Sequence, residues 1–204
     1  MAFDKNVFIN CPFDKDYTQL LRTLTFVLLY LDLEPNLSQT LSSSTIRINQ
    51  IKQHIKNCKY SIHDLSRSKA LKKGELPRFN MPYELGLDIG AAEYGSNKLQ
   101  TKKALILETD RYHYQKVLSD IAGQDIANHN NDPKTLTLKV RNWLSDISPK
   151  KTISSASQIW NAFNQFNADL ITNLHPTYTT TEIDEMPVGD YIKFTKDWLV
   201  KFKL

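Results

Sequence analysis

Apolar residues along the chain follow two different spacings, and these predict strands that alternate with helices. Leucine and valine side chains recur every three or four residues between 14 and 33, which is typical of a helix with one buried face. Similar helical patterns follow at 45–57, 80–94 and 133–147. Short apolar runs predict strands at 6–10, 34–37, 58–65 and 103–108, with a short fifth expected within 123–129.

Strands that alternate with helices form βαβ units and a mostly parallel sheet. About five strands within residues 1–147 predict an α/β domain of flavodoxin-like order. A polar stretch at 148–157 is the best linker candidate, and residues 148–204 form the expected helical extension packed on that domain. Its two aromatic-rich helical patterns, at 158–174 and 188–202, are expected to cover the sheet or each other. The alternative is a subunit interface, where aromatic residues are enriched.

Composition excludes several classes of protein. With 204 residues, 41% hydrophobic and 24% charged, the chain is long enough for a folded core. No apolar run approaches the ~18 residues of a membrane span, and the first residues do not resemble a signal peptide, so we expect a cytoplasmic protein without a membrane partner. A net charge of +4 is too small to indicate direct nucleic-acid binding.

Common cofactor and metal motifs are absent from the sequence. There is no GxxxxGK[ST], and no GxGxxG follows the first predicted strand. The five histidines are scattered and the two cysteines are far apart, so no metal site is expected. Cys11 could be a nucleophile, but the sequence identifies no base for it, and a buried thiol is the simpler interpretation. Cys11 and Cys58 are expected at opposite ends of neighbouring strands, about 15 Å apart, which excludes a disulfide.

Ligands of open parallel sheets bind beyond the carboxyl ends of the strands. This rule directs attention to 10–16, to 64–67 and to the region after 108. It also directs attention to the string PRFNMPYELG at 77–86, which places Glu84 in the first turn of a helix. The simple interpretation of Glu84 is a favourable interaction with the helix dipole. Asp88 lies four residues after Glu84, so the two carboxylates share one face of the predicted helix. Gly86 and Gly90 are also four residues apart, and they leave a stripe without side chains that a sheet or a ligand could approach closely.

We therefore expect one pocket formed by a strand end and this helix. It would hold two carboxylates, an amide and two aromatic rings: Asp64, Glu84, Asn10, Phe13 and Tyr83. Two carboxylates suit cleavage of a bond to an anomeric carbon, and aromatic rings can stack on a base. Arg67 and Arg78 border the pocket and are candidates to bind phosphate, whereas Lys69, Lys72 and Lys73 more simply form a solvated loop face.

Four strings, VFINCPFDKDY, YSIHDLSR, PRFNMPYELGLDIG and RYHYQKVLSDIAGQDIANH, resemble a bacterial family of nucleotide-binding, TIR-like proteins. The resemblance runs from Val7 to about Trp143, and more loosely through Ile159 to Leu170. More distantly, Asp64 and the Glu84-Leu85-Gly86 string are similar to nucleoside 2-deoxyribosyltransferases and TIR-domain NAD hydrolases. That resemblance implies a TIR/deoxyribosyltransferase-like sheet, with Glu84 as the catalytic carboxylate and Asp64 orienting the ribose. By the same similarity, Asn10 to Phe13 form part of the base or ribose pocket. Together with the residues that the spacing itself brings to this pocket, the expected substrate-binding residues are Asn10, Cys11, Phe13, Ser66, Arg67, Arg78, Asn80, Tyr83, Asp88 and Asp120.

The resemblance also implies a function. It predicts an enzyme that cleaves or transfers at the N-glycosidic bond of NAD or a related nucleotide, used as substrate without any further cofactor, in bacterial anti-phage immunity. A homo-oligomer or a partner effector protein is expected. Two alternatives stay open: a sensor that binds a nucleotide signal without chemistry, and a scaffold module that binds no nucleotide.

Overall fold

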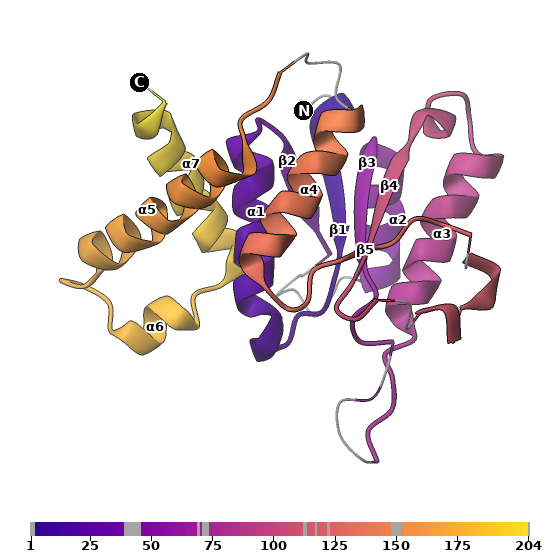
Figure 1. The fold of residues 1–204 in the computed structure, drawn as a ribbon, viewed down its shortest axis with the longest axis horizontal. Helices are drawn as coiled ribbons and strands as arrows, with labels where there is room; N and C mark the ends of the chain where they lie inside the picture. The colour runs from indigo at the N-terminus through magenta and orange to yellow at the C-terminus, as the bar shows by residue number, and fades with distance from the viewer. Residues whose placement is uncertain are drawn as a thin grey trace.

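The structure is a computed structural model that describes residues 3–38, 46–68, 70, 74–111, 114–116, 118–121, 123–147 and 152–203. Its centre is a five-stranded, all-parallel sheet of order β2-β1-β3-β4-β5 (Figure 1). The strands are β1 (Asn6–Asn10), β2 (Glu34–Leu37), β3 (Tyr60–Asp64), β4 (Lys103–Glu108) and β5 (Ala127–Asn128). The predicted flavodoxin-like α/β fold is confirmed.

The predicted helices are also present. They are α1 (Thr18–Tyr30), α2 (Arg47–Asn57), α3 (Asn80–Tyr94), α4 (Pro133–Ile147), α5 (Ala156–Leu174) and α7 (Val188–Phe202). α1 begins later than the apolar pattern suggested, because Lys15–Tyr17 form a separate 3-10 turn. The sequence analysis missed α6 (Thr180–Asp184) and the short 3-10 turns at Phe3–Lys5, Lys15–Tyr17, Leu99–Thr101, Tyr114–Lys116 and Ser119–Ile121.

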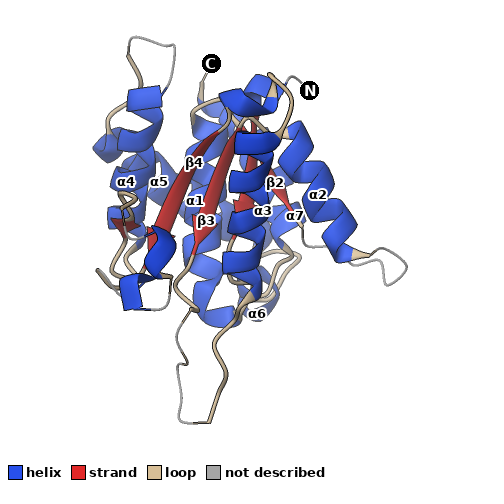
Figure 2. Cartoon of the chain, turned by 90° about the vertical axis from the view of Figure 1, so that its right-hand side faces the viewer, coloured by secondary structure: helices blue, strands red, loops and turns tan. Residues whose placement is uncertain are grey.

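The helices cover the two faces of the sheet. Figure 2 shows α2 and α3 in front of the strands, while α1 and α4 lie behind them. Side chains of a strand point alternately to the two faces. Val7 and Ile9 belong to the core under α1 and α4, whereas Phe8, between them, packs with Ile51 and Ile55 of α2.

The C-terminal helices α5 and α7 add a third layer outside α1 (Figure 1). The Phe26 ring of α1 lies 5.4 Å from Phe163, 5.6 Å from Phe166 and 6.2 Å from Trp198, measured between ring centroids. α5 begins at a capping box formed by Ser155 and Gln158. These aromatic stripes therefore cover α1 rather than the sheet itself, and they extend the main core.

Some residues singled out in the sequence lie outside the residues that the structure describes. Lys69, Lys72 and Lys73 lie outside them, as do the first residue of the helical pattern at 45–57 and residues 148–151 of the linker candidate at 148–157. Cys11 and Cys58 are both free and buried, so the expectation that they form no disulfide is confirmed. Within the described part of the chain, no helix is long and apolar enough to cross a membrane.

Candidate functional site

The strand order places a topological switch point between β1 and β3. β2 lies on one side of β1 and β3 on the other, so the chain leaves the two carboxyl ends in opposite directions and opens a crevice there. The amino end of α3 is held at this crevice, because Asn10 Nδ2 donates a hydrogen bond of 3.0 Å to the carbonyl oxygen of Met81. α2 also begins at this edge, since it follows β2 and runs back to the start of β3.

Glu84 belongs to α3, one turn after Met81 and on the side of the sheet that α3 covers. It lies beyond the first turn of α3, so the expectation of a first-turn position is wrong. Only 2% of the residue is exposed, and its Oε2 atom has no hydrogen-bond partner in the structure. Arg47 Nη2, from the first residue of α2, lies 3.7 Å from Glu84 Oε1, and its guanidinium carbon lies 5.7 Å from the centre of the Phe13 ring. Burial raises the pKa of Glu84, while Arg47 and Asn80 oppose that shift.

Unpartnered polar atoms gather at the same edge of the sheet. Apart from Glu84 Oε2, the side-chain oxygens Asn10 Oδ1, Ser38 Oγ and Ser68 Oγ, each in a buried residue, have no hydrogen-bond partner among the described residues. Ser38 follows β2, Asn10 ends β1, and Ser68 lies in the turn after β3. A buried polar group without a partner is costly, so several of them at the usual binding edge indicate a site for a polar ligand.

A buried polar network joins α3 to the sheet below this site. The His63 ring lies between two side chains of this network. Its Nδ1 atom is 3.0 Å from Asn10 Nδ2, and its Nε2 atom is 3.2 Å from Asp88 Oδ2. The Ser61 hydroxyl donates to the same Asp88 oxygen, and Lys102 Nζ forms an ion pair of 3.0 Å with Oδ1. Burial opposes ionisation of Asp88, but the His63 hydrogen bond and the Lys102 charge lower its pKa to about 2. The predicted binding residue Asp88 therefore anchors α3 and is not open to a ligand.

Asp64 lies in a second buried network, on the opposite face of the sheet. Its carboxylate accepts hydrogen bonds from the Tyr17 hydroxyl (2.5 Å) and from the Ser66 amide (2.8 Å), and it lies 3.0 Å from His129 Nε2. Ser66 Oγ also lies 3.1 Å from His129 Nε2. Burial opposes ionisation of Asp64, but these hydrogen bonds and His129 lower its pKa.

The expectation that Asp64 and Glu84 share one pocket is therefore wrong. Asp64 is fully buried and points with Ile62 towards α1 and α4, whereas Glu84 belongs to α3 on the other face. The expected ribose-orienting role of Asp64 has no support in this geometry.

Arg67 and Arg78 converge on a carboxylate that the sequence analysis did not single out. Arg67 forms two hydrogen bonds to Asp14, of 3.1 Å from Nε and 2.9 Å from Nη2. Arg78 Nη2 lies 3.5 Å from Asp14 Oδ2, and its amide donates to the Arg67 carbonyl. Arg67 is thus committed to Asp14, and these contacts hold Arg67 and Arg78 beside the residue that follows Phe13.

The other predicted site residues are either closed off or exposed. Cys11 is 2% exposed, and burial raises the pKa of its thiol, so it is not a reactive thiolate. Asn80, Tyr83 and Asp120 are exposed. A side chain at Gly86 or Gly90 would meet no atom within 4 Å, so neither glycine is required by close approach of the sheet.

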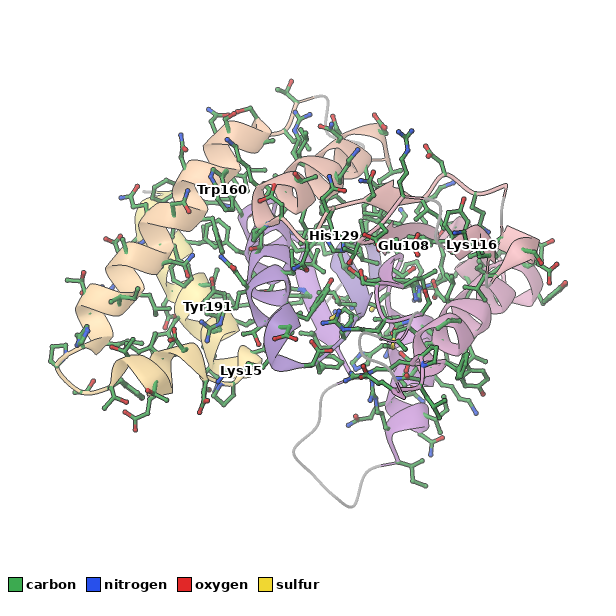
Figure 3. The ribbon with its side chains drawn as sticks, turned by 60° about the horizontal axis from the view of Figure 1, so that its bottom comes forward. Lys15, Glu108, Lys116, His129, Trp160 and Tyr191 are labelled. Atoms are coloured by element: carbon green, nitrogen blue, oxygen red, sulfur yellow. The ribbon has the colours of Figure 1, made fainter. Side chains whose placement is uncertain are left out.

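The structure adds residues that the sequence analysis missed as site candidates. Arg47 belongs to no sequence motif. It becomes a site candidate only because the amino ends of α2 and α3 lie at the same edge of the sheet. His63 and Asp64 are adjacent in β3. Because side chains of a strand alternate between the two faces of the sheet, the sequence could have predicted that these two lie on opposite faces. His129 follows β5, and its amide donates to the carbonyl oxygen of Glu108 at 3.0 Å (Figure 3).

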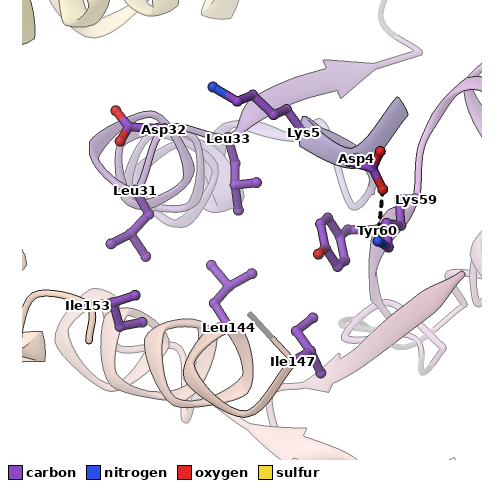
Figure 4. A pocket seen from close by; sticks show the side chains of 10 residues that line it. All are labelled: Asp4, Lys5, Leu31, Asp32, Leu33, Lys59, Tyr60, Leu144, Ile147 and Ile153. Atoms are coloured by element: carbon purple, nitrogen blue, oxygen red, sulfur yellow. Dashed lines mark hydrogen bonds and ion pairs between the residues drawn. The ribbon is translucent and has the colours of Figure 1, made fainter. Parts of the chain in front are cut away.

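Two cavities of the described part of the chain lie elsewhere on the molecule, and the second is lined in part by the charged side chains of Lys15, Arg22, Asp184 and Glu185. A largely apolar cavity of about 290 Å³ lies at the amino ends of β1 and β3, under Leu31, Leu33 and Tyr60 (Figure 4). A groove of about 790 Å³ runs between α1 and α5, with Gln19 and Asn164 among its lining residues. Neither Glu84 nor Asp64 lines either of these two.

Comparison with known protein families, with curated proteins and with solved structures gave no significant match. The resemblance to TIR-like proteins therefore depends on the sequence strings alone. Within the described residues, no group of three or more histidine, cysteine or acidic side chains could hold a metal ion.

Proposed function

We propose that the chain binds a nucleotide at the carboxyl edge of the sheet and that Glu84 acts on its N-glycosidic bond. The observation that carries this proposal is the buried, unpartnered Oε2 of Glu84 at the switch point, next to Arg47 and Phe13. Free carboxylate and amide oxygens suit the hydroxyl groups of a ribose, an aromatic ring suits a base, and a guanidinium suits a phosphate.

Glu84 has a chemical role in this proposal that a single carboxylate can perform. In hydrolysis, the bond between C1′ and the base nitrogen breaks, and its electron pair leaves with the base. A water oxygen then bonds to C1′ and releases a proton, while the ionised carboxylate stabilises the positive charge on the sugar. In transfer, the hydroxyl of a second sugar would replace the water. The resemblance to NAD hydrolases and deoxyribosyltransferases supports this reaction class, with NAD as the first substrate to test and anti-phage immunity as the setting.

A nucleotide sensor is the second candidate, and specific observations favour it. Glu84 is almost completely buried, and Asp64, the second carboxylate that the reaction was expected to use, is held by Tyr17 and His129. A pocket with a single buried carboxylate can bind a ribose without cleaving it. In that case the bound nucleotide would change the contacts of α2 and α3 with a partner effector or a second copy.

The test is a panel of NAD, NADP, ATP and deoxynucleosides incubated with the wild-type chain and with Glu84→Gln. We expect the wild type to release nicotinamide or a free base, and the variant to lose at least about 100-fold in rate, because its amide cannot carry the negative charge. Chromatography of the products measures both. Glu93→Gln is the matched control, since Glu93 is an exposed carboxylate on the same helix and its loss should leave the rate unchanged.

Two outcomes would change the conclusion. Full activity in Glu84→Gln would show that Glu84 does not act in the reaction. Binding of a nucleotide by calorimetry, without any turnover across a wide range of protein concentrations, would favour the sensor.

A further inference from the structure

Among the described arginines at the carboxyl edge, Arg47 and Arg78 are held less firmly than Arg67, and Arg47 is the one that lies beside Glu84. Arg78 has an ion pair of 3.5 Å to Asp14 and a side chain that is 45% exposed. Arg67 makes two hydrogen bonds to Asp14, but the nearest acidic oxygen to Arg47 is Glu84 Oε1 at 3.7 Å, which is too far for a hydrogen bond. The Arg47 side chain is 46% exposed. Among the described residues, its guanidinium is accompanied by this long ion pair and by the Phe13 ring, whose centre lies 5.7 Å from the guanidinium carbon.

The backbone around Arg47 carries further positive character. Arg47 opens α2, and the preceding residue, Ile46, gives that helix no side-chain cap; the 15-residue helix α3 likewise has no side-chain cap from Phe79. Neither helix has an acidic residue in its first turn. The first amides of a helix lack intrahelical partners and favour anions, so two uncapped helices meeting at one crevice attract negative charge.

We infer that Arg47 is the residue that recognises a phosphate group of the ligand and so makes the site specific for nucleotides over nucleosides. This inference rests on the proposed function and adds the substrate class of the same site. Glu84 Oε2 and Asn10 Oδ1, both buried and unpartnered, supply the independent sign that a polar ligand belongs here. Acceptor oxygens on one side and a guanidinium on the other match a molecule that carries hydroxyl donors and an anion together, as a ribose phosphate does.

The same geometry explains why Arg47 rather than Arg67 takes this role. An incoming phosphate would have to displace Asp14 from two hydrogen bonds to reach Arg67. At Arg47 it replaces only a long contact with Glu84, and it draws the guanidinium away from that carboxylate. Phosphate binding at Arg47 therefore opens the way to Glu84 and commits Arg47 to the ligand.

The experiment compares calorimetric binding of ADP, AMP and adenosine to the wild type, Arg47→Ala, Arg47→Lys and Lys52→Ala. We expect Arg47→Ala to weaken ADP binding at least about tenfold while adenosine binding stays the same, because a bidentate charged hydrogen bond is lost. Arg47→Lys should recover only part of it. Lys52→Ala is the matched control, since Lys52 is an exposed cation on the same helix and its removal changes the net charge equally.

The outcomes separate the two proposals. Equal loss of ADP and adenosine binding in Arg47→Ala, or equal loss of ADP binding in Lys52→Ala, would overturn the role of Arg47 and leave the site in place. No binding of any of the three ligands to the wild type would overturn both the nucleotide site and Arg47. Selective loss of ADP binding together with unchanged catalysis in Glu84→Gln would keep the role of Arg47 and reject that of Glu84.

Discussion

Single buried charges decide how α3 is held above the sheet. Asp88 and Lys102 are both buried and pair across 3.0 Å, so removing one of them leaves the other charge without compensation. We expect Asp88→Asn to lower the free energy of unfolding by about 3–5 kcal/mol at pH 7. Urea unfolding measures this change. Asp146→Asn, at an exposed carboxylate of α4, should change it by less than about 0.5 kcal/mol, and an equally small effect of Asp88→Asn would contradict the structural role given to that pair.

The same carboxylate predicts how stability depends on acid. The pKa of Asp88 is about 2 in the folded chain and about 3.9 when unfolded, so its stabilising contribution is present above pH ~4 and disappears as the pH falls towards 2. We therefore expect the stability gap between the wild type and Asp88→Asn to narrow between pH 5 and pH 2.5, measured by urea unfolding at each pH. A gap that stays constant across this range would mean that the pKa of Asp88 is the same in the folded and the unfolded chain, and a gap that widens would mean that the folded state raises this pKa.

At the scale of the helices, aromatic side chains of α5 pack against both α1 and α7. The Phe166 ring of α5 lies 5.6 Å from Phe26, 5.3 Å from Tyr191 and 5.6 Å from Trp198. We expect Phe166→Ala to cost about 3–5 kcal/mol of unfolding free energy, because it leaves a cavity between three helices. Ile171→Ala, on the same helix but 47% exposed, should cost under about 1 kcal/mol. Equal effects in thermal or urea unfolding would show that α5 is not packed in this way.

How far the sequence predicts these elements depends on their length and periodicity. The bounds of α3, α4 and β4 follow directly from long apolar patterns and come out as predicted. The five-residue helix α6 is too short to show a period, although the spacing of Thr179 and Glu182 forms a capping box that could have indicated it. Short elements are therefore better found from their caps than from their hydrophobic pattern.

The candidate site is harder to predict because it depends on which face each helix covers. Alternation along β3 puts Ser61 and His63 on one face of the sheet and Ile62 and Asp64 on the other. The sequence does not show that α3 covers the first of these faces, so Asp64 and Glu84 could be placed together only by assumption. The contact between Arg47 and Glu84 could not be predicted either, because it depends on the packing of α2 beside α3, which is a tertiary property.

Across the whole molecule, one hydrophobic core crosses the boundary expected at residue 147. The cluster that holds Val7 and Ile62 of the sheet also holds Phe166 of α5 and Tyr191 and Leu199 of α7. We therefore expect the chain to unfold in a single cooperative transition, with the same midpoint by far-ultraviolet circular dichroism and by tryptophan fluorescence, since Trp143 and Trp198 report on opposite sides of that boundary.

Removing the C-terminal helices tests the same core more severely. A chain of residues 1–147 would expose Leu21, Phe26 and their neighbours on α1, so we expect it to aggregate or to lose its cooperative transition. Phe202→Ala in the complete chain is the milder control, because Phe202 is 40% exposed at the end of α7 and should keep the transition with a small shift. A truncated chain that stays monomeric and unfolds as sharply as the complete chain would show that the sheet and its four helices form an independent domain, and that α5–α7 are an attachment to it. Size-exclusion chromatography and urea unfolding of the two chains, at matched concentrations, distinguish these outcomes.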